Sequence, residues 1–296
     1  MVLRAKHAQS DPLLTAVASA PGLIMQESSR LPLLPGMIDS HFHYPEMKKK
    51  GIDAEKIIKE CFDSGMEAMV DVSINVSNYE TRLKFALKNK NYFISAGISP
   101  WGANDPIEEI EKTTAILETH VSETKNTKKL IAVGETGLDW HWNHGTPEKQ
   151  ILLFEKQLEI AQKFDLPVII HNREADKEVI SSLKKKTPSR GGIIHCFSSD
   201  YNFASSCIDM GFLISFAGNV TYPKCAVLAE VAKKIPASSI LIETDAPYLS
   251  PQEKRAVPNN PGLIGYTYKF IAEQRGEDIN TLILSVKENF IRLFGL

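Results

Sequence analysis

Residues 147–171, PEKQILLFEKQLEIAQKFDLPVIIH, join a long amphipathic segment to a short apolar run, and this unit decides the fold. The segment 148–164 carries apolar residues at helical spacing, and Thr146 and Pro147 before it suit the N-cap and the first position of a helix. The run 167–171 is apolar on both faces, which is typical of a parallel strand covered by helices. A strand that directly follows such a helix indicates an α/β protein.

The same alternation of apolar runs and helical segments extends over the rest of the chain. Ser77 and Glu80 form a capping-box pattern at the start of one helix, and two helices are expected at about 263–275 and 278–294. Eight predicted strands favour a single (β/α)8 barrel, or TIM barrel, over an open doubly wound sheet. We expect one domain over residues 35–296 and an extension of uncertain structure over 1–34. The predicted strands span residues 37–41, 68–73, 92–98, 130–136, 167–171, 192–196, 212–218 and 239–245.

The composition restricts the classes of ligand and compartment. The chain has 296 residues, 43% of them hydrophobic, and a net charge of −2, so an anionic ligand must be captured locally, for example by metal ions. No apolar stretch approaches the roughly 20 residues that span a membrane. The four cysteines contain no C-x-x-C pair and indicate buried thiols in the cytoplasm. Asp11 and Pro12 interrupt the apolar run of a possible secretory signal, which makes export the less favoured alternative.

Six potential metal ligands stand at the ends of five predicted strands. Active sites of (β/α)8 barrels lie at the carboxyl ends of the strands, so we expect these side chains to meet there. Residues two positions apart on a strand share a face, so two histidines spaced in this way can bind one ion. Asp39 lies on that same face and is expected to hold a ligand imidazole in the correct tautomer. The six residues are His41, His43, Glu135, His171, His195 and Asp245.

The number of donors indicates two divalent ions. His41, His43 and Asp245 can hold one ion and His171 with His195 the other, while Glu135 bridges them. Zinc is the first candidate, and magnesium, manganese or nickel are alternatives. Two such ions would bring the pKa of a shared water toward neutrality and stabilise the attacking and leaving oxygens of the reaction.

Four polar residues have predicted roles around the ions. Asp245 is the expected proton acceptor, and Glu135 is the second expected catalytic residue. Two divalent ions outweigh two carboxylates, so the site favours phosphate, and Arg173 is expected to donate to a phosphate oxygen unless it is a surface arginine at a helix start. Glu243 is either a support for a ligand or a buried salt-bridge partner.

Other polar and aromatic residues near the strand ends have more ordinary expected roles. His141 and His144 follow the fourth strand, and a polar loop over the barrel is the preferred interpretation. The alternative is contact with substrate, with Trp140 or Trp142 stacking on a nucleobase. Cys196 follows a predicted ligand on its strand, so its thiol should point toward the helix layer and be structural.

Several motifs in order resemble those of the TatD-like metal-dependent deoxyribonucleases of the amidohydrolase superfamily. They are DSHFH, GETGLDW, LPVIIHNREA, HCFSS, SFAGNVTY and ETDAPYLSP, and the match runs from about Pro35 to the C-terminus. The resemblance implies a barrel with one or two metal ions and hydrolysis of phosphodiester bonds in DNA, most often by a 3′–5′ exonuclease. Carried over by motif, the family's ligands fall on the same six residues.

The chain departs from the family pattern around the expected substrate site. Ser99 replaces a histidine after the third strand, Ser199 replaces a glycine, and a basic segment after the eighth strand is reduced to EKRAVPNNP at 253–261. These changes leave open the cleavage of an amide, a lactone or a small phosphoester. A metal-stabilised barrel that binds without turnover is disfavoured, because all six ligands are present and one of them can accept a proton. No protein partner is inferred, and the oligomeric state stays open.

Overall fold

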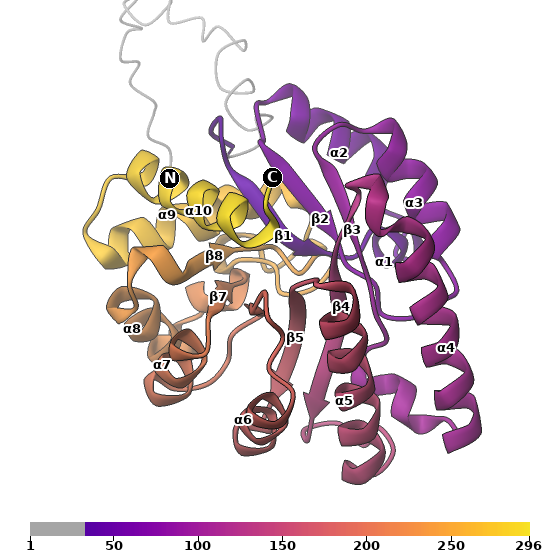
Figure 1. The fold of residues 1–296 in the computed structure, drawn as a ribbon. Coiled ribbons are helices and arrows are strands. Elements are labelled where there is room, and N and C mark those ends of the chain that lie inside the picture. Colours follow the sequence, from indigo (N-terminus) through magenta and orange to yellow (C-terminus); the bar gives the residue numbers. More distant parts are fainter. Residues whose placement is uncertain (1–32) are drawn as a thin grey trace, which may run out of the picture. The chain divides into compact units, whose positions relative to one another are not determined.

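The computed structural model describes residues 33–296, in which eight parallel strands follow one another around a ring (Figure 1). The last strand returns to the first: the backbone N–H of Asp245 donates to His41 at 2.9 Å, and that of His43 donates to Ala246 at 2.8 Å. The predicted (β/α)8 barrel is therefore confirmed. The strands are β1 (Ile38–Phe42), β2 (Ala68–Asp71), β3 (Tyr92–Ala96), β4 (Leu130–Asp139), β5 (Val168–Arg173), β6 (Gly192–Ile194), β7 (Phe212–Phe216) and β8 (Ile240–Ile242).

Helices cover the outside of the ring (Figure 1). Thr146 caps its helix as predicted, because its side chain accepts the backbone N–H of Lys149. The predicted capping box at Ser77 is wrong: Asn78 holds the N-cap position, and the Ser77 hydroxyl bonds the side chain of Asn75 instead. The helices are α1 (Tyr44–Lys49), α2 (Ala54–Asp63), α3 (Tyr79–Lys88), α4 (Ile107–Thr124), α5 (Pro147–Phe164), α6 (Asp176–Lys185), α7 (Tyr201–Asp209), α8 (Ala226–Lys234), α9 (Ile264–Arg275) and α10 (Ile279–Phe294).

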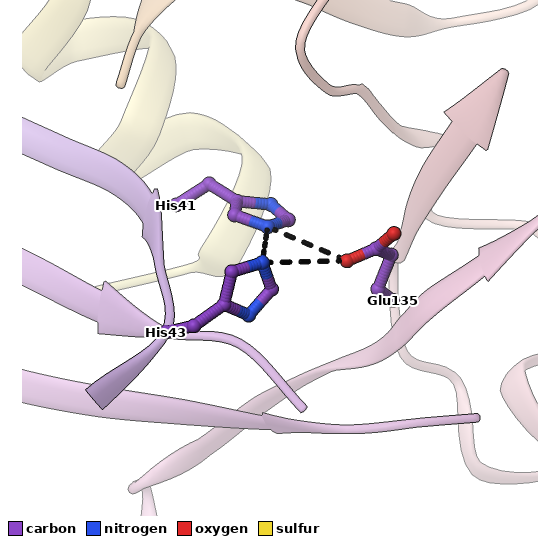
Figure 2. A group of neighbouring side chains, drawn as sticks. All are labelled: His41, His43 and Glu135. Carbon is purple, nitrogen blue, oxygen red and sulfur yellow. Dashed lines mark hydrogen bonds and ion pairs between the residues drawn. The ribbon is translucent and has the colours of Figure 1, made fainter. Parts of the chain in front are cut away.

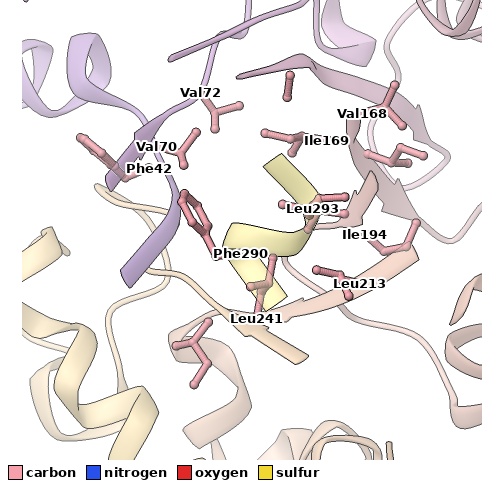
Figure 3. Close-up of a cluster of buried hydrophobic side chains, with 14 of the residues drawn as sticks. Phe42, Val70, Val72, Val168, Ile169, Ile194, Leu213, Leu241, Phe290 and Leu293 are labelled. Carbon is pink, nitrogen blue, oxygen red and sulfur yellow. The ribbon is translucent and has the colours of Figure 1, made fainter. Parts of the chain in front are cut away.

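Helix α10 lies across the amino-terminal opening of the barrel. Its residue Phe290 projects among side chains from the surrounding strands in Figure 3, and its ring centroid is 6.3 Å from that of Phe93 near the start of β3. Phe294 lines a groove together with Leu130 and Pro167, at the starts of β4 and β5. Because α10 covers this end, the carboxyl ends of the strands are left to form a site.

The structure describes only part of the predicted N-terminal extension. The expectation for residues 1–34 falls outside the described residues, apart from Leu33 and Leu34, and the domain boundary at residue 35 stays a prediction. Within residues 33–296, no helix combines the length and the apolar character that crossing a membrane requires.

Candidate metal centre

The six predicted ligands converge at the carboxyl end of the barrel from five strands. One lies on β1 and one directly after it, one lies on β4, one on β5, and the others come just after β6 and β8. Five of the six are buried, and His171 is half-buried. The structure thus brings together residues that are up to two hundred positions apart in the sequence.

Four donor atoms form what we call the first group: Nε2 of His41, Nε2 of His43, Oε2 of Glu135 and Oδ1 of Asp245. The two imidazole nitrogens are 3.2 Å apart, and both lie 3.6 Å from Glu135 Oε2, as Figure 2 shows. Asp245 Oδ1 lies 3.7 Å from His41 and 3.4 Å from His43. Ligand atoms of a tetrahedral zinc ion are about 3.4 Å apart, because each bond is about 2.0–2.1 Å long. The first group therefore fits one divalent ion.

Three donor atoms form the second group: Nδ1 of His171, Nε2 of His195 and Oε1 of Glu135. The two nitrogens are 3.3 Å apart, and they lie 3.2 Å and 3.5 Å from the carboxylate oxygen. The spacing again matches that of atoms around one ion. Glu135 offers a different oxygen to each group, which is the arrangement that a bridging carboxylate requires.

Hydrogen bonds set the tautomers of two of the histidines. Nδ1 of His43 faces the carbonyl of Val72 at 2.9 Å, and Nε2 of His171 faces Asp139 Oδ2 at 3.0 Å. Each of these nitrogens must carry the proton that it donates, so the other ring nitrogen presents a lone pair to its group. This is the protonation pattern that a metal ligand needs.

Glu243 lies behind the rings of the two remaining histidines. Its Oε1 is 3.4 Å from Nδ1 of His195 and accepts the backbone N–H of Cys196 at 2.7 Å. The rings of His41 and His195 stack with centroids 3.9 Å apart. Oε2 of Glu243 and Nδ1 of His41 are both buried and have no hydrogen-bond partner among the described residues. Nδ1 of His195 also has no hydrogen-bond partner among the described residues. One donor atom from each of His41, His195 and Glu243 lies within 4.8 Å of the others, so Glu243 is the carboxylate beside both rings.

Asp39 does not contact an imidazole, so this prediction is wrong. Its carboxylate accepts the backbone N–H of His41 at 3.3 Å, together with the N–H and the hydroxyl of Thr244 at 3.0 and 2.6 Å. Burial raises the pKa of Asp39 to about 8, against the lowering effect of the Thr244 bonds. Asp39 instead joins the end of β1 to the segment after β8 through these three bonds.

The sequence analysis missed Asp139, which contacts one of the predicted ligands. Strand β4 runs to Asp139, whereas the prediction ended at residue 136. Residues at even separations on a strand share a face, so Asp139 lies on the same side as Glu135. A longer strand estimate would have revealed this alternation. Its carboxylate also accepts the backbone N–H groups of His141 and Trp142 at 2.9 and 3.0 Å.

A family model described as TatD related DNase matches residues 38–295. The chain belongs to this family. A metal-dependent hydrolase of Bacillus subtilis, YabD, is 33% identical over 88% of this chain and 99% of its own length. A TatD of Erwinia amylovora, named a 3′-5′ ssDNA/RNA exonuclease, is 31% identical over 82% of this chain and 94% of its own. The crystal structure of the Escherichia coli TatD homologue YJJV has a TM-score of 0.76 and 25% identity, and covers 89% of this chain and all of that one.

The chain is thus a metal-dependent hydrolase of the TatD family, and the charges of its donor cluster fit divalent metal binding. Burial would raise the pKa of Glu135, but His195 and His171 hold it well below its usual range. Burial would lower the pKa of His43, His171 and His195, but the neighbouring carboxylates outweigh it and raise all three. Burial lowers the pKa of His41 well below its usual value. The cluster therefore attracts positive charge, either protons or cations.

The rim of this TatD-family site carries exposed cations. Arg173, the last residue of β5, is exposed. Tyr248 belongs to the motif ETDAPYLSP, but the sequence analysis gave it no role. Its ring centroid lies 6.2 Å from that of His43. The ammonium of Lys50 lies 4.4 Å from the Tyr248 ring centroid. Tyr248 thus lies next to the first donor group with Lys50 against its ring, and Arg173 ends the strand that carries His171.

Cys196 lies beyond the end of its strand, where the predicted alternation of side chains does not hold. Strand β6 ends at Ile194, and Cys196 has a φ of 45°, so the alternation of a strand no longer applies to it. Burial raises the pKa of its thiol well above the usual range, and the carboxylates of Asp245 and Glu243 raise it further. The end of the strand therefore removes the basis for the predicted direction of the thiol, and its structural role stays a prediction.

Proposed function

We propose that this protein is a 3′–5′ exonuclease that hydrolyses phosphodiester bonds of single-stranded DNA. The observation that carries the proposal is the position of the Glu135 carboxylate between the two donor groups. Its two oxygens face two separate pairs of histidine nitrogens. Two-ion centres of this kind suit in-line displacement at phosphorus. The Erwinia amylovora relative, named as an exonuclease on single-stranded nucleic acid, supports this choice of substrate.

The two donor groups would hold two divalent ions, with zinc as the first candidate. Imidazole and carboxylate ligands suit zinc, and also manganese or nickel; magnesium is an alternative at the position with fewer nitrogens. When bound, the ions would supply an activated water and neutralise charge on the phosphate. His41, His43 and Asp245 would hold one ion, His171 and His195 the other, and Glu135 would contact both.

Asp245 is the proposed acceptor of the proton from the attacking water. Its carboxylate lies at the open side of the first group, and its φ of 55° is in the left-handed region that a non-glycine residue rarely adopts. The backbone bond to His41 and the bond from Tyr248 N–H to the Asp245 carbonyl, both 2.9 Å, hold this conformation. Such local strain is typical of functional positions. Arg173 is the proposed donor to a phosphate oxygen.

Replacement of Asp245 tests the proposed mechanism. Asp245→Asn should reduce metal-dependent hydrolysis of a labelled single-stranded oligonucleotide by about 10²–10⁴-fold, the usual contribution of a general base. Asp209→Asn, at an exposed carboxylate on the end of α7, is the control and should retain activity. A rate for Asp245→Asn within a few-fold of the wild type would overturn the proposed role.

A substrate panel tests the proposed reaction. Single-stranded DNA with a 3′ or 5′ label, duplex DNA, RNA, a small phosphoester, a lactone and an N-acyl amino acid should be compared under the same metal conditions. We expect the fastest turnover with single-stranded DNA and release of nucleotides from the 3′ end. Preference for the amide or the lactone would replace the nuclease proposal with the alternative hydrolase.

We also propose that the protein acts in the cytoplasm. The four cysteine thiols are free in the structure, which suits a reducing compartment. Fractionation of cells should recover the protein with the cytoplasmic marker.

A further inference from the structure

We propose that Trp101 and Trp142 form a stacking surface for the bases of single-stranded nucleic acid, an inference that rests on the proposed function. With His141 and His144, these residues make up what we call the aromatic rim. The sequence analysis considered Trp140 or Trp142 as the stacking residue and preferred an ordinary polar loop. The structure adds Trp101, which lies next to His144, and links the backbone of Trp142 to the second donor group through Asp139.

The aromatic rim follows two neighbouring strands of the barrel. Trp101 lies in the 3-10 turn Pro100–Asn104 after β3, and Trp142 comes three residues after the end of β4, which pairs with β3. The indoles are 41% and 56% exposed. His141 packs edge-to-face on Trp142 with ring centroids 4.8 Å apart, and His144 lies 5.8 Å from Trp101.

One carboxylate connects the aromatic rim to the second donor group. Asp139 accepts the backbone N–H of Trp142 through Oδ1, while its Oδ2 contacts the His171 ring at 3.0 Å. The charges of Asp139 and His171 also affect the pKa of His144, which burial lowers. The backbone of Trp142 is therefore connected to His171, one of the proposed metal ligands, through the single carboxylate of Asp139.

Side-chain bonds hold the two parts of the aromatic rim in place. Asn104 accepts the backbone N–H of Gly145 at 2.9 Å and bonds Nδ1 of His144 at 3.4 Å, which joins the segment after β3 to the segment after β4. On the other side, Nδ1 of His141 contacts Glu174 at 2.8 Å. Because the backbone is anchored, stacking a base on these rings would cost little ordering.

The exposed tryptophans differ from the nearby Trp140, which has a structural role. Trp140 is half-buried against the core and donates its indole N–H to Glu178 at 3.3 Å. Trp101 and Trp142 are exposed instead, and each has an imidazole beside its ring. A protein with a net charge of −2 has little general electrostatic attraction for a phosphate backbone. Base stacking would add affinity for single-stranded nucleic acid that does not depend on this charge. Stacking also tolerates any base, which suits an exonuclease.

Binding to an oligonucleotide with and without bases tests the inference. The measurement uses the full-length protein with Asp245→Asn, so that the probe is not consumed, and compares oligothymidylate with an abasic strand of the same length. Stacking of one base contributes about 5- to 150-fold in affinity. Trp101→Ala and Trp142→Ala should each remove much of the preference for the strand with bases and leave abasic binding unchanged. Trp101→Phe and Trp142→Phe should retain most of it.

The matched control is Leu284→Ala, which removes an exposed apolar side chain from α10. It should leave the preference unchanged. If the Asp245→Asn parent prefers the strand with bases and both alanine variants keep that preference, the stacking surface is wrong while the proposed function stands. If the parent binds neither strand and the wild type cleaves none, both proposals fail. A change of oligomeric state with the base preference intact would assign the indoles to a protein contact and overturn the inference.

Discussion

At the scale of single residues, three of the predicted ligand histidines have a polar group beside the second ring nitrogen. His43 bonds a backbone carbonyl, His171 bonds Asp139, and the carboxylate of Glu243 lies 3.4 Å from His195. Such partners fix the ring orientation and raise the basicity of the ligand nitrogen. The carboxylates behind the histidines are therefore as open to test as the ligands themselves.

Glu243→Gln should weaken metal binding by about 10- to 100-fold, the usual effect of losing a partner of a ligand histidine. A carboxylate can accept protons from both His41 and His195, whereas an amide offers one acceptor and one competing donor. Competition with a chromophoric chelator measures the affinity, and elemental analysis measures the number of ions. Glu174→Gln, which alters an exposed carboxylate paired with His141, is the control. Equal affinity in the two variants would show that Glu243 is only structural.

Metal binding should release protons and weaken as the pH falls. Carboxylates raise the pKa values of His43, His171 and His195 above the ordinary value of 6.5, so these rings keep their protons to a higher pH than free histidine does. An ion must displace those protons, so the apparent affinity should rise with pH through the range above 6.5. Calorimetric titration in two buffers of different ionisation enthalpy counts the protons released. Release should be larger at pH 6.5 than at pH 9, and no release at either pH would contradict this account.

At the scale of elements, the position of Glu135 depends on the close approach of β3 and β4. A Cβ atom on Gly97 would lie 2.3 Å from the carbonyl carbon of Gly134, so glycine is required where the two segments meet. The Ser95 hydroxyl accepts the backbone N–H of Ser73 at 3.0 Å and donates to the Gly134 carbonyl. The N–H of Glu135 in turn donates to the Ser73 carbonyl at 2.8 Å. These bonds hold the backbone of the proposed bridging ligand.

Ser95→Ala should therefore reduce both stability and metal affinity. It leaves the Ser73 N–H and the Gly134 carbonyl without their buried partner, which costs about 1–3 kcal/mol of unfolding free energy. Ser40→Ala is the control, because Ser40 is also fully buried and bonds Ser215 and the Ile242 carbonyl, away from Glu135. Denaturant unfolding should show a loss in both variants. A chelator titration should show weaker metal binding in Ser95→Ala alone, and an equal effect on binding in the two variants would argue against a positioning role.

At the scale of the whole molecule, the donor groups join strands from opposite parts of the barrel. Residues after β1 and β8 meet residues of β4, β5 and β6 around Glu135. The cluster places four imidazoles and two carboxylates in a largely buried volume. An ion bound there would connect segments that the hydrogen bonds between neighbouring strands do not connect directly.

Removal of metal should lower the thermal stability of the protein. Free ligand at about 1,000 times its Kd stabilises a folded protein by about 4 kcal/mol, which raises Tm by roughly 8–16 °C for a domain of about this size. Differential scanning calorimetry with chelator and with added zinc measures this shift. His43→Asn should show a smaller response, because it removes one donor of the first group. An identical Tm in chelator and in zinc would mean that metal does not bind the folded state.

The sequence by itself determined the barrel and the six candidate ligands. Strands buried on both faces read as continuous apolar runs, which is why all eight were found, and the barrel topology places polar residues at their carboxyl ends close together. That these six residues bind metal stays a prediction, as does the role of Arg173. The capping pattern at Ser77 was weaker evidence, since Asn78 could compete for the same position.

Only the tertiary structure decided which groups bond to one another around the site. Asp39 bonds backbone donors and not an imidazole, Asp139 contacts His171, and the backbone of Cys196 turns out of the strand. Alternation along a strand predicts side-chain directions only while the strand continues, and β6 stops two residues before Cys196. Partners separated by thirty to two hundred positions depend on strand register and on closure of the ring, which are properties of the folded chain and not of any local segment.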